Sequence, residues 1–144
     1  MFWGHDWAWG LPLILATIIT HVVVLGFVTR TGIEILTRAG QRRKSLLLFS
    51  TVIGVIALLS TALLALESIA WGYAYLALGA LPDTRTAFLY SLNAMTAFGH
   101  TDIHLDTRWR LMGALEALNG IILFGLTIGF LFATIQSSGP LRSR

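Results

Sequence analysis

The sequence predicts an all-α membrane protein with three transmembrane helices and one shorter helix that enters the membrane and returns to the same side. Of its 144 residues, 56% are hydrophobic and only 12% are charged, a balance typical of polytopic membrane proteins. Three apolar segments are long enough to cross a bilayer. A fourth helical segment of about 12 residues would extend about 18 Å, which is short of the roughly 30 Å hydrocarbon core.

The first predicted span covers residues 11–29 and follows an N-terminal segment that contains three tryptophans and no lysine or arginine. Tryptophan is enriched at membrane interfaces, and the lack of basic residues favours the non-cytoplasmic side. A cleaved signal peptide would begin with a basic region, so we interpret this span as a retained helix. His21 lies in its middle, and we expect it to have a nearby partner. The alternative is a pH-sensing role, because histidine changes charge near neutral pH.

Residues 30–44 form a predicted basic loop that contains half of the ten lysine and arginine residues and one acidic residue, Glu34. The positive-inside rule places this loop in the cytoplasm. Its apolar residues could lie along the lipid headgroups; they are Ile33, Ile35 and Leu36. The second span, about residues 45–70, returns to the outside. It is predicted to end in an aromatic belt at the outer interface, formed by Trp71, Tyr73 and Tyr75.

The fourth helical segment, Thr86–Ala97, lies between the second and third spans. Its apolar residues recur at helical spacing: they are Phe88, Leu89, Leu92 and Met95. Pro82-Asp83-Thr84 is a helix-start signal in front of it. The exit segment, Thr96–Asp102, must leave through irregular backbone, which is tolerated at membrane depth only where protein or water surrounds it. We therefore expect this exit to line a wet space.

The third span covers about residues 111–136, after an anchor formed by Arg108-Trp109-Arg110. The tail that follows is basic and is predicted to be cytoplasmic. The charges therefore agree on an integral, multi-pass membrane protein with its N-terminus outside and its C-terminus in the cytoplasm. The net charge of +3 is interpreted as a topology signal rather than as a nucleic-acid interface.

The order of these elements resembles the pore domain of tetrameric potassium-type cation channels, whose filter pattern is Thr-Val-Gly-Tyr-Gly-Asp. Aligned on its first glycine and its aspartate, this pattern falls on Ala97–Asp102. Gly99 and Asp102 match, whereas Ala97, His100 and Thr101 replace the threonine, the tyrosine and the second glycine. A one-residue gap would instead match Thr96 and Gly99, so both alignments stay open.

The resemblance implies a homotetramer around a central pore in a bacterial inner membrane, surrounded by lipid. Residues 45–137 would be the pore domain, residues 1–44 an interfacial segment with an extra helix and a basic loop, and residues 138–144 a cytoplasmic tail. In this family, backbone carbonyls replace the water shell of a permeating cation. The expected ligands are potassium or sodium ions, with no other cofactor. The implied filter comprises Thr96, Ala97, Phe98, Gly99, His100, Thr101 and Asp102.

The departures from the family pattern predict weakened or altered potassium selectivity. Ala97 removes a hydroxyl ligand, and Thr101 resists the positive φ that glycine adopts freely. Fewer ordered rings of carbonyl groups should then remain. The alternative is a non-conducting, channel-like scaffold or accessory protein with a collapsed filter.

Ionisable and amide side chains within the predicted spans are expected to support the pore, because such groups are costly in lipid and usually face a partner or water. Glu116 and Asn119 are three residues apart and so share one helix face. Two interpretations stay open: a polar lining behind the filter, or a carboxyl group that holds the short helix in place. Glu67 could act in the same way. The expected partners on the short helix are Tyr90, Ser91 and Asn93.

Acidic and histidine side chains alternate across the mouth of the exit, at His100, Asp102, His104 and Asp106. Alternate side chains of an extended segment share a face, which makes His100, Asp102 and His104 weak candidates for a divalent-metal site. The spacing matches no specific metal motif, and solvated loop residues are the alternative. No nucleophile–base arrangement is recognisable, so a membrane metalloenzyme is the least favoured hypothesis and we do not expect an enzyme.

Overall fold

The computed structural model describes residues 4–38, 46–99 and 103–138, which are helical apart from short connections and contain no strand. The elements are α1 (Gly4–Arg38), α2 (Leu46–Ala77), α3 (Thr84–Met95), the short 3-10 helix η2 (Thr107–Trp109) and α4 (Arg110–Ser138). Three helices, α1, α2 and α4, are long and apolar enough to cross a membrane. The prediction of an all-α fold with three helices of membrane-spanning length is confirmed.

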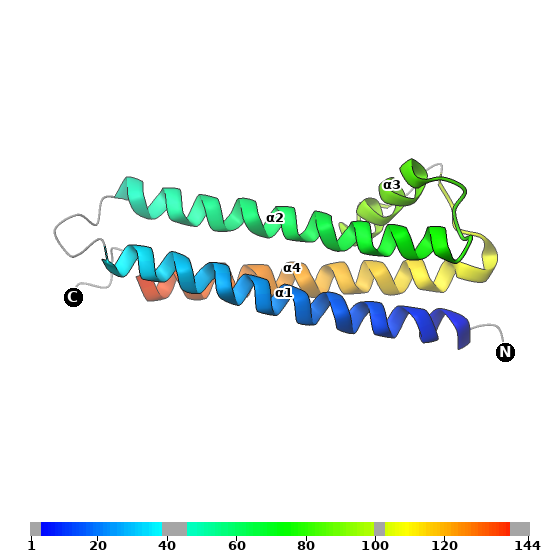
Figure 1. Cartoon of the computed structure of the whole chain (residues 1–144), viewed down its shortest axis with the longest axis horizontal. Helices are drawn as coiled ribbons and strands as arrows, with labels where there is room; N and C mark the ends of the chain where they lie inside the picture. The colour runs from blue at the N-terminus through cyan, green and yellow to red at the C-terminus, as the bar shows by residue number, and fades with distance from the viewer. Residues whose placement is uncertain (1–3, 39–45, 100–102, 139–144) are drawn as a thin grey trace.

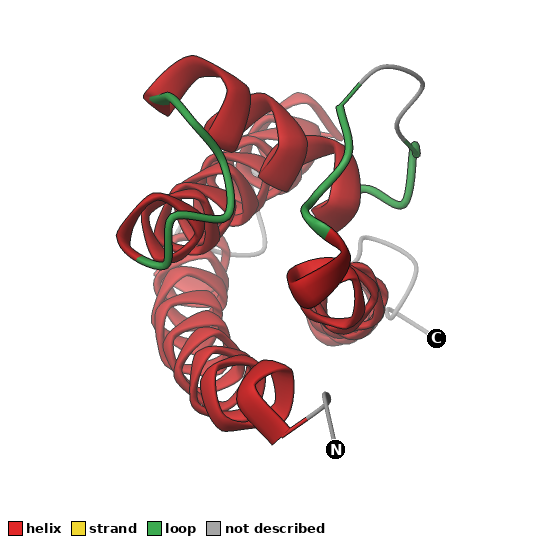
Figure 2. Ribbon diagram, turned by 90° about the vertical axis from the view of Figure 1, so that its right-hand side faces the viewer, coloured by secondary structure: helices red, strands yellow, loops and turns green. Residues whose placement is uncertain are grey.

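The three long helices lie side by side, and α3 lies against α2 and α4 at one end of the bundle (Figures 1 and 2). Helix α1 begins at the end of the bundle where α3 lies, α2 returns to that end, and α4 leaves it (Figure 1). Helix α3 has 12 residues and would extend only about 18 Å. The fold therefore combines three full-length helices with one short helix between the second and third.

Helix α1 is longer than the sequence predicted, because it continues through Arg38 instead of ending near Thr29. Glu34 forms ion pairs with Arg30 (3.4 Å) and Arg38 (3.6 Å), one turn away on either side. Such pairs support an exposed helix surface. Leu36 is buried in a cluster with Val52 and Ile56 of α2. Part of the predicted loop is thus helical, and Leu36 packs against protein rather than lying along the headgroups.

Two of the three aromatic residues expected at the outer interface are core residues. Trp71 and Tyr75 are fully buried, whereas Tyr73 is 60% exposed. Helix α2 continues to Ala77, so Trp71 and Tyr75 lie within its last turns, next to α3. The rings of Tyr75 and Tyr90 meet edge to face with centroids 5.3 Å apart, a favourable aromatic geometry. The core therefore lies where α2, α3 and α4 meet.

Two glycines on α4 allow close approach of α3. A Cβ atom on Gly120 would overlap the backbone carbonyl of Met95, and one on Gly113 would overlap the hydroxyl of Tyr90. By contrast, a Cβ atom on Gly125 or Gly129 would meet nothing within 4 Å. Small residues are a common means of close helix packing in membranes. Gly120 therefore fixes how closely the C-terminal end of α3 approaches α4.

The substitution Gly120→Ala is expected to destabilise the fold by about 1–3 kcal/mol, the usual cost of overpacking. Its methyl group would meet a backbone carbonyl, which cannot rotate away as a side chain can. Unfolding followed by circular dichroism in detergent would measure the loss. Gly125→Ala is the matched control and should be neutral or slightly stabilising, because alanine is the better helix former. Equal stability of the two variants would contradict the close contact.

Candidate functional site

The start of α3 is fixed by Asp83, which is its N-cap residue. The carboxylate accepts hydrogen bonds from the backbone N–H of Thr86 (3.0 Å) and from its hydroxyl group (2.7 Å). These bonds to Thr86 lower the pKa of the Asp83 carboxyl, because they stabilise its charged form. The helix-start signal in the sequence is confirmed, although the helix begins at Thr84 rather than at Thr86.

The end of α3 is closed by two backbone hydrogen bonds that form a Schellman motif. The N–H of Phe98 donates to the carbonyl of Asn93 (3.0 Å), and the N–H of Ala97 donates to the carbonyl of Ala94 (2.9 Å). Ala97 has a φ of +54°, a conformation that glycine usually supplies and that costs other residues about 1–2 kcal/mol. Sequence reasoning missed this cap, since it considered Ala97 only as a residue without a hydroxyl group.

The described part of the exit segment alternates in backbone handedness. Gly99 has a φ of +89°, whereas Phe98, between Gly99 and Ala97, is not among the residues with positive φ. All four residues from Thr96 to Gly99 are exposed, and the Phe98 side chain is 84% exposed. The helix cap accounts for Ala97 but not for Gly99. The remaining predicted filter residues, His100, Thr101 and Asp102, lie outside the described part of the chain.

Glu116 of α4 joins its own helix to α2 and to the middle of α3. It is fully buried and accepts a hydrogen bond from the hydroxyl of Tyr75 on α2 (2.7 Å). Its second carboxyl oxygen is hydrogen-bonded to the hydroxyl of Ser91 on α3. Ser91 also contacts the carbonyl of Ser68 at 2.5 Å. These contacts agree with the interpretation in which the carboxyl group holds the short helix in place.

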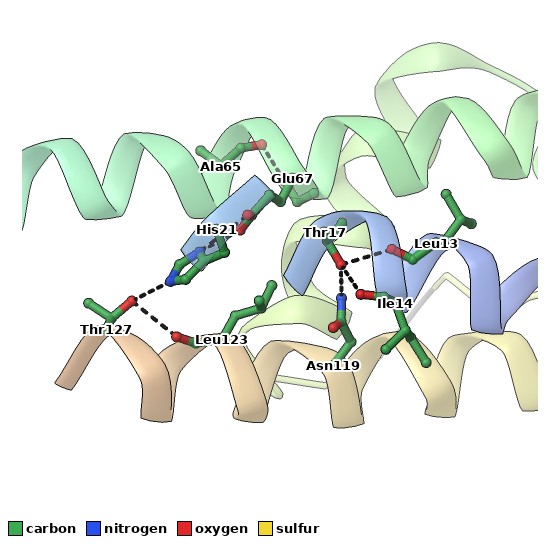
Figure 3. Close-up of polar contacts among 10 residues, drawn as sticks. Leu13, Ile14, Thr17, His21, Ala65, Glu67, Asn119, Leu123 and Thr127 are labelled. Atoms are coloured by element: carbon green, nitrogen blue, oxygen red, sulfur yellow. Dashed lines mark hydrogen bonds and ion pairs between the residues drawn. The ribbon is translucent and has the colours of Figure 1, made fainter. Parts of the chain in front are cut away.

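Asn119 and Glu67 have partners that differ from those predicted. Asn119 donates to the hydroxyl of Thr17 on α1 (2.8 Å), although it was expected to act on the same face as Glu116. Glu67 contacts Nδ1 of His21 at 3.1 Å, and Nε2 of His21 lies 3.0 Å from the hydroxyl of Thr127 (Figure 3). Both side chains join α1 to the bundle, because α1 covers the faces of α2 and α4 on which they lie.

Asp6 was given no role from the sequence, and Asn93 was given a different one. Asp6 is 2% exposed and accepts a hydrogen bond from the backbone N–H of Met112 (3.0 Å). It therefore satisfies a free donor in the first turn of α4, although its segment was predicted to lie at the interface. Asn93 was expected to support the pore through its side chain, and the structure uses its backbone carbonyl in the cap of α3.

His104 is the histidine of the predicted metal site that the structure describes. It is exposed and lines an open cavity of about 370 Å³ with Tyr90 and Arg110. Among the described residues, no group of three histidine, cysteine, aspartate or glutamate side chains could hold a metal ion. His100 and Asp102 fall outside those residues. The described part of the mouth therefore provides one of the three candidate ligands.

The C-terminal end of α3 can attract a cation to the exit segment. The C-terminal end of a helix carries a partial negative charge of about −0.5 from its free carbonyl groups, and α3 directs that end toward Thr96–Gly99.

Comparisons of the chain with protein-family models, curated proteins and solved structures found no match. The functional interpretation therefore depends on the geometry of this site.

Glu67→Ala is expected to destabilise the fold by about 1–3 kcal/mol, because it leaves Nδ1 of the buried His21 without its hydrogen-bond partner. Glu34→Ala is the matched control, since it also removes contacts between a glutamate and basic side chains, but at a residue that is 48% exposed. That change should cost less than about 1 kcal/mol. Similar losses of unfolding free energy in the two variants would contradict the buried pair.

The Asp83 cap is expected to make stability depend on acid pH. A carboxyl whose pKa is lowered in the folded state contributes stability above its unfolded pKa and loses it as the pH falls through the folded pKa. Asp83→Asn keeps an oxygen acceptor but does not titrate. The difference in melting temperature between the wild type and this variant should therefore shrink as the pH falls from neutral to strongly acidic. A difference that stays constant would contradict the charged cap.

Proposed function

We propose that this chain is one subunit of a homotetrameric cation pore of potassium-channel architecture. It would passively conduct monovalent cations, potassium among them, across a bacterial inner membrane, with the N-terminus outside and the C-terminus in the cytoplasm. The observation that carries the proposal is α3, a helix too short to cross a membrane, which is held between α2 and α4 and followed by the exposed segment Thr96–Gly99.

The backbone of this segment supports a role in binding cations. Positive φ at Ala97 and Gly99, with Phe98 between them, is the alternation that turns successive carbonyl groups toward one side. Carbonyl oxygens arranged in this way can replace the hydration shell of a cation. One chain supplies one wall of such a path, so a ring of four copies around a symmetry axis is proposed. The neighbouring copies in such a ring would cover Phe98, whose apolar side chain is 84% exposed in the single chain.

Selectivity for potassium over sodium is proposed to be weak. Ala97 carries a methyl group where the family pattern carries a hydroxyl ligand, so one ring of oxygen ligands would be missing. Conduction of this kind needs no catalytic residue and no bound cofactor.

The second candidate is a channel-like membrane scaffold or accessory protein that does not conduct. The observation that favours it is the same replacement at Ala97, because a filter with fewer ligands for its ions has less to hold it open. The two candidates share the fold and the tetramer, and they differ in ion flux.

Potassium and sodium flux into liposomes that contain the purified tetramer would test the proposal. The wild type should conduct both ions, and Gly99→Ala should reduce flux about tenfold or more, because strain of about 1–3 kcal/mol would depopulate the conducting backbone. Gly54→Ala is the matched control, since a Cβ atom there meets nothing within 4 Å.

Three results would count against this account. Absence of flux through a wild-type tetramer would contradict conduction and favour the scaffold. Unchanged flux in Gly99→Ala would contradict a path lined by this segment. A preference for potassium over sodium by orders of magnitude would contradict the weak selectivity.

A further inference from the structure

Four buried oxygen-bearing groups form a chain from α2 through α4 to α3 and back to α2. They are the Tyr75 hydroxyl, the Glu116 carboxyl, the Ser91 hydroxyl and the Ser68 carbonyl. Tyr75 lies 2.7 Å from one Glu116 oxygen, Ser91 contacts the other, and Ser91 lies 2.5 Å from the Ser68 carbonyl. Tyr75, Ser91 and Glu116 are fully buried, and Ser68 is 4% exposed.

The number of protons available to this chain decides the state of Glu116. A serine hydroxyl has one proton, and a backbone carbonyl has none. Both oxygen contacts of Ser91 are within hydrogen-bond distance, so each needs a proton between its two oxygens. If Ser91 donates to Ser68, the proton between Ser91 and Glu116 must come from the carboxyl group. If Ser91 donated to Glu116, two bare acceptors would face each other at Ser68.

The charges around Glu116 lead to the same assignment. Among the described residues, the basic side chains in contact with a glutamate are His21, beside Glu67, and two arginines, beside Glu34, and none of them contacts Glu116. A buried carboxylate without a cation is strongly disfavoured. A neutral carboxylic acid avoids that cost and still makes both hydrogen bonds.

We propose that Glu116 is a neutral carboxylic acid in the folded chain and acts as a positioning residue for α3. It accepts a hydrogen bond from Tyr75 and donates one to Ser91, which in turn donates to the carbonyl of Ser68. All three hydrogen bonds then run in one direction, and every proton is used once. This inference does not depend on ion conduction and can be tested without measuring it.

A glutamine offers the same pattern as a protonated glutamate, with one oxygen acceptor and an N–H donor, whereas a carboxylate only accepts. Glu116→Gln should therefore keep the unfolding equilibrium constant within about tenfold of the wild-type value. Glu116→Ala should raise it by about a hundredfold, because it leaves the buried hydroxyl of Tyr75 without its acceptor and removes the donor to Ser91. A glutamine variant that is as unstable as the alanine variant would overturn the proposal.

Infrared spectroscopy gives a direct test of the protonation state. The chain has three glutamates, Glu34, Glu67 and Glu116, so protein labelled with ¹³C at glutamate carboxyl groups gives a simple spectrum. At neutral pH we expect a protonated-carboxyl C=O band that disappears in Glu116→Gln. A difference spectrum that shows only the loss of a carboxylate band would overturn the proposal.

A second variant decides the matter if Glu116→Gln does not fold. Ser91→Ala removes the acceptor of the Glu116 proton, so the C=O band should move to higher frequency as that hydrogen bond is lost. Ser60→Ala is the matched control, because Ser60 is equally buried and its hydroxyl bonds the carbonyl of Ile56 in its own helix (2.8 Å). A band that stays in place in Ser91→Ala, or moves equally in Ser60→Ala, would overturn the proposal.

Discussion

The end of a helix leaves carbonyl groups without partners, and the fold meets this constraint at the C-terminal end of α3. The N–H groups of Ala97 and Phe98 satisfy two of these carbonyls, although Ala97 must adopt a conformation that favours glycine. Gly120 lets the end of the helix lie directly against α4. Glu116 holds the middle of the helix to both long neighbours. These contacts fix the short helix at its middle and at its C-terminal end.

Helix α1 is attached to the bundle by polar contacts along its N-terminal half, in addition to the apolar packing of Leu36 near its other end. Lipid tails are as apolar as leucine, so apolar contact alone does not fix a helix against its neighbours in a membrane. Polar groups do so, because exposing them to lipid is costly. The contacts pair Asp6 with Met112, Thr17 with Asn119, and His21 with Glu67 and Thr127. Helix α1 is therefore a defined part of the same packed unit as α2, α3 and α4.

Lengths, charges and cap signals in the sequence were enough to predict the three long helices, and Asp83 was enough to predict the start of α3 within two residues. The packing faces could not be predicted in the same way, because both buried and lipid-facing surfaces of a membrane helix are apolar. Trp71 and Tyr75 therefore resembled interface residues, and Glu67 resembled a brace for α3. Their true neighbours come from segments distant in the sequence. The cap at Ala97 was missed for a different reason, since alanine carries no signal for positive φ.

In the proposed topology, α3 enters and leaves the membrane on the same side, so that the chain crosses three times. Because the chain contains no cysteine, single cysteines at exposed positions can be labelled with a membrane-impermeant maleimide in sealed, oriented vesicles. Thr84→Cys and His104→Cys, which flank α3 and its exit, should react from one side, and Ser137→Cys near the end of α4 should react from the other. Labelling of Thr84→Cys and His104→Cys from opposite sides would contradict the account.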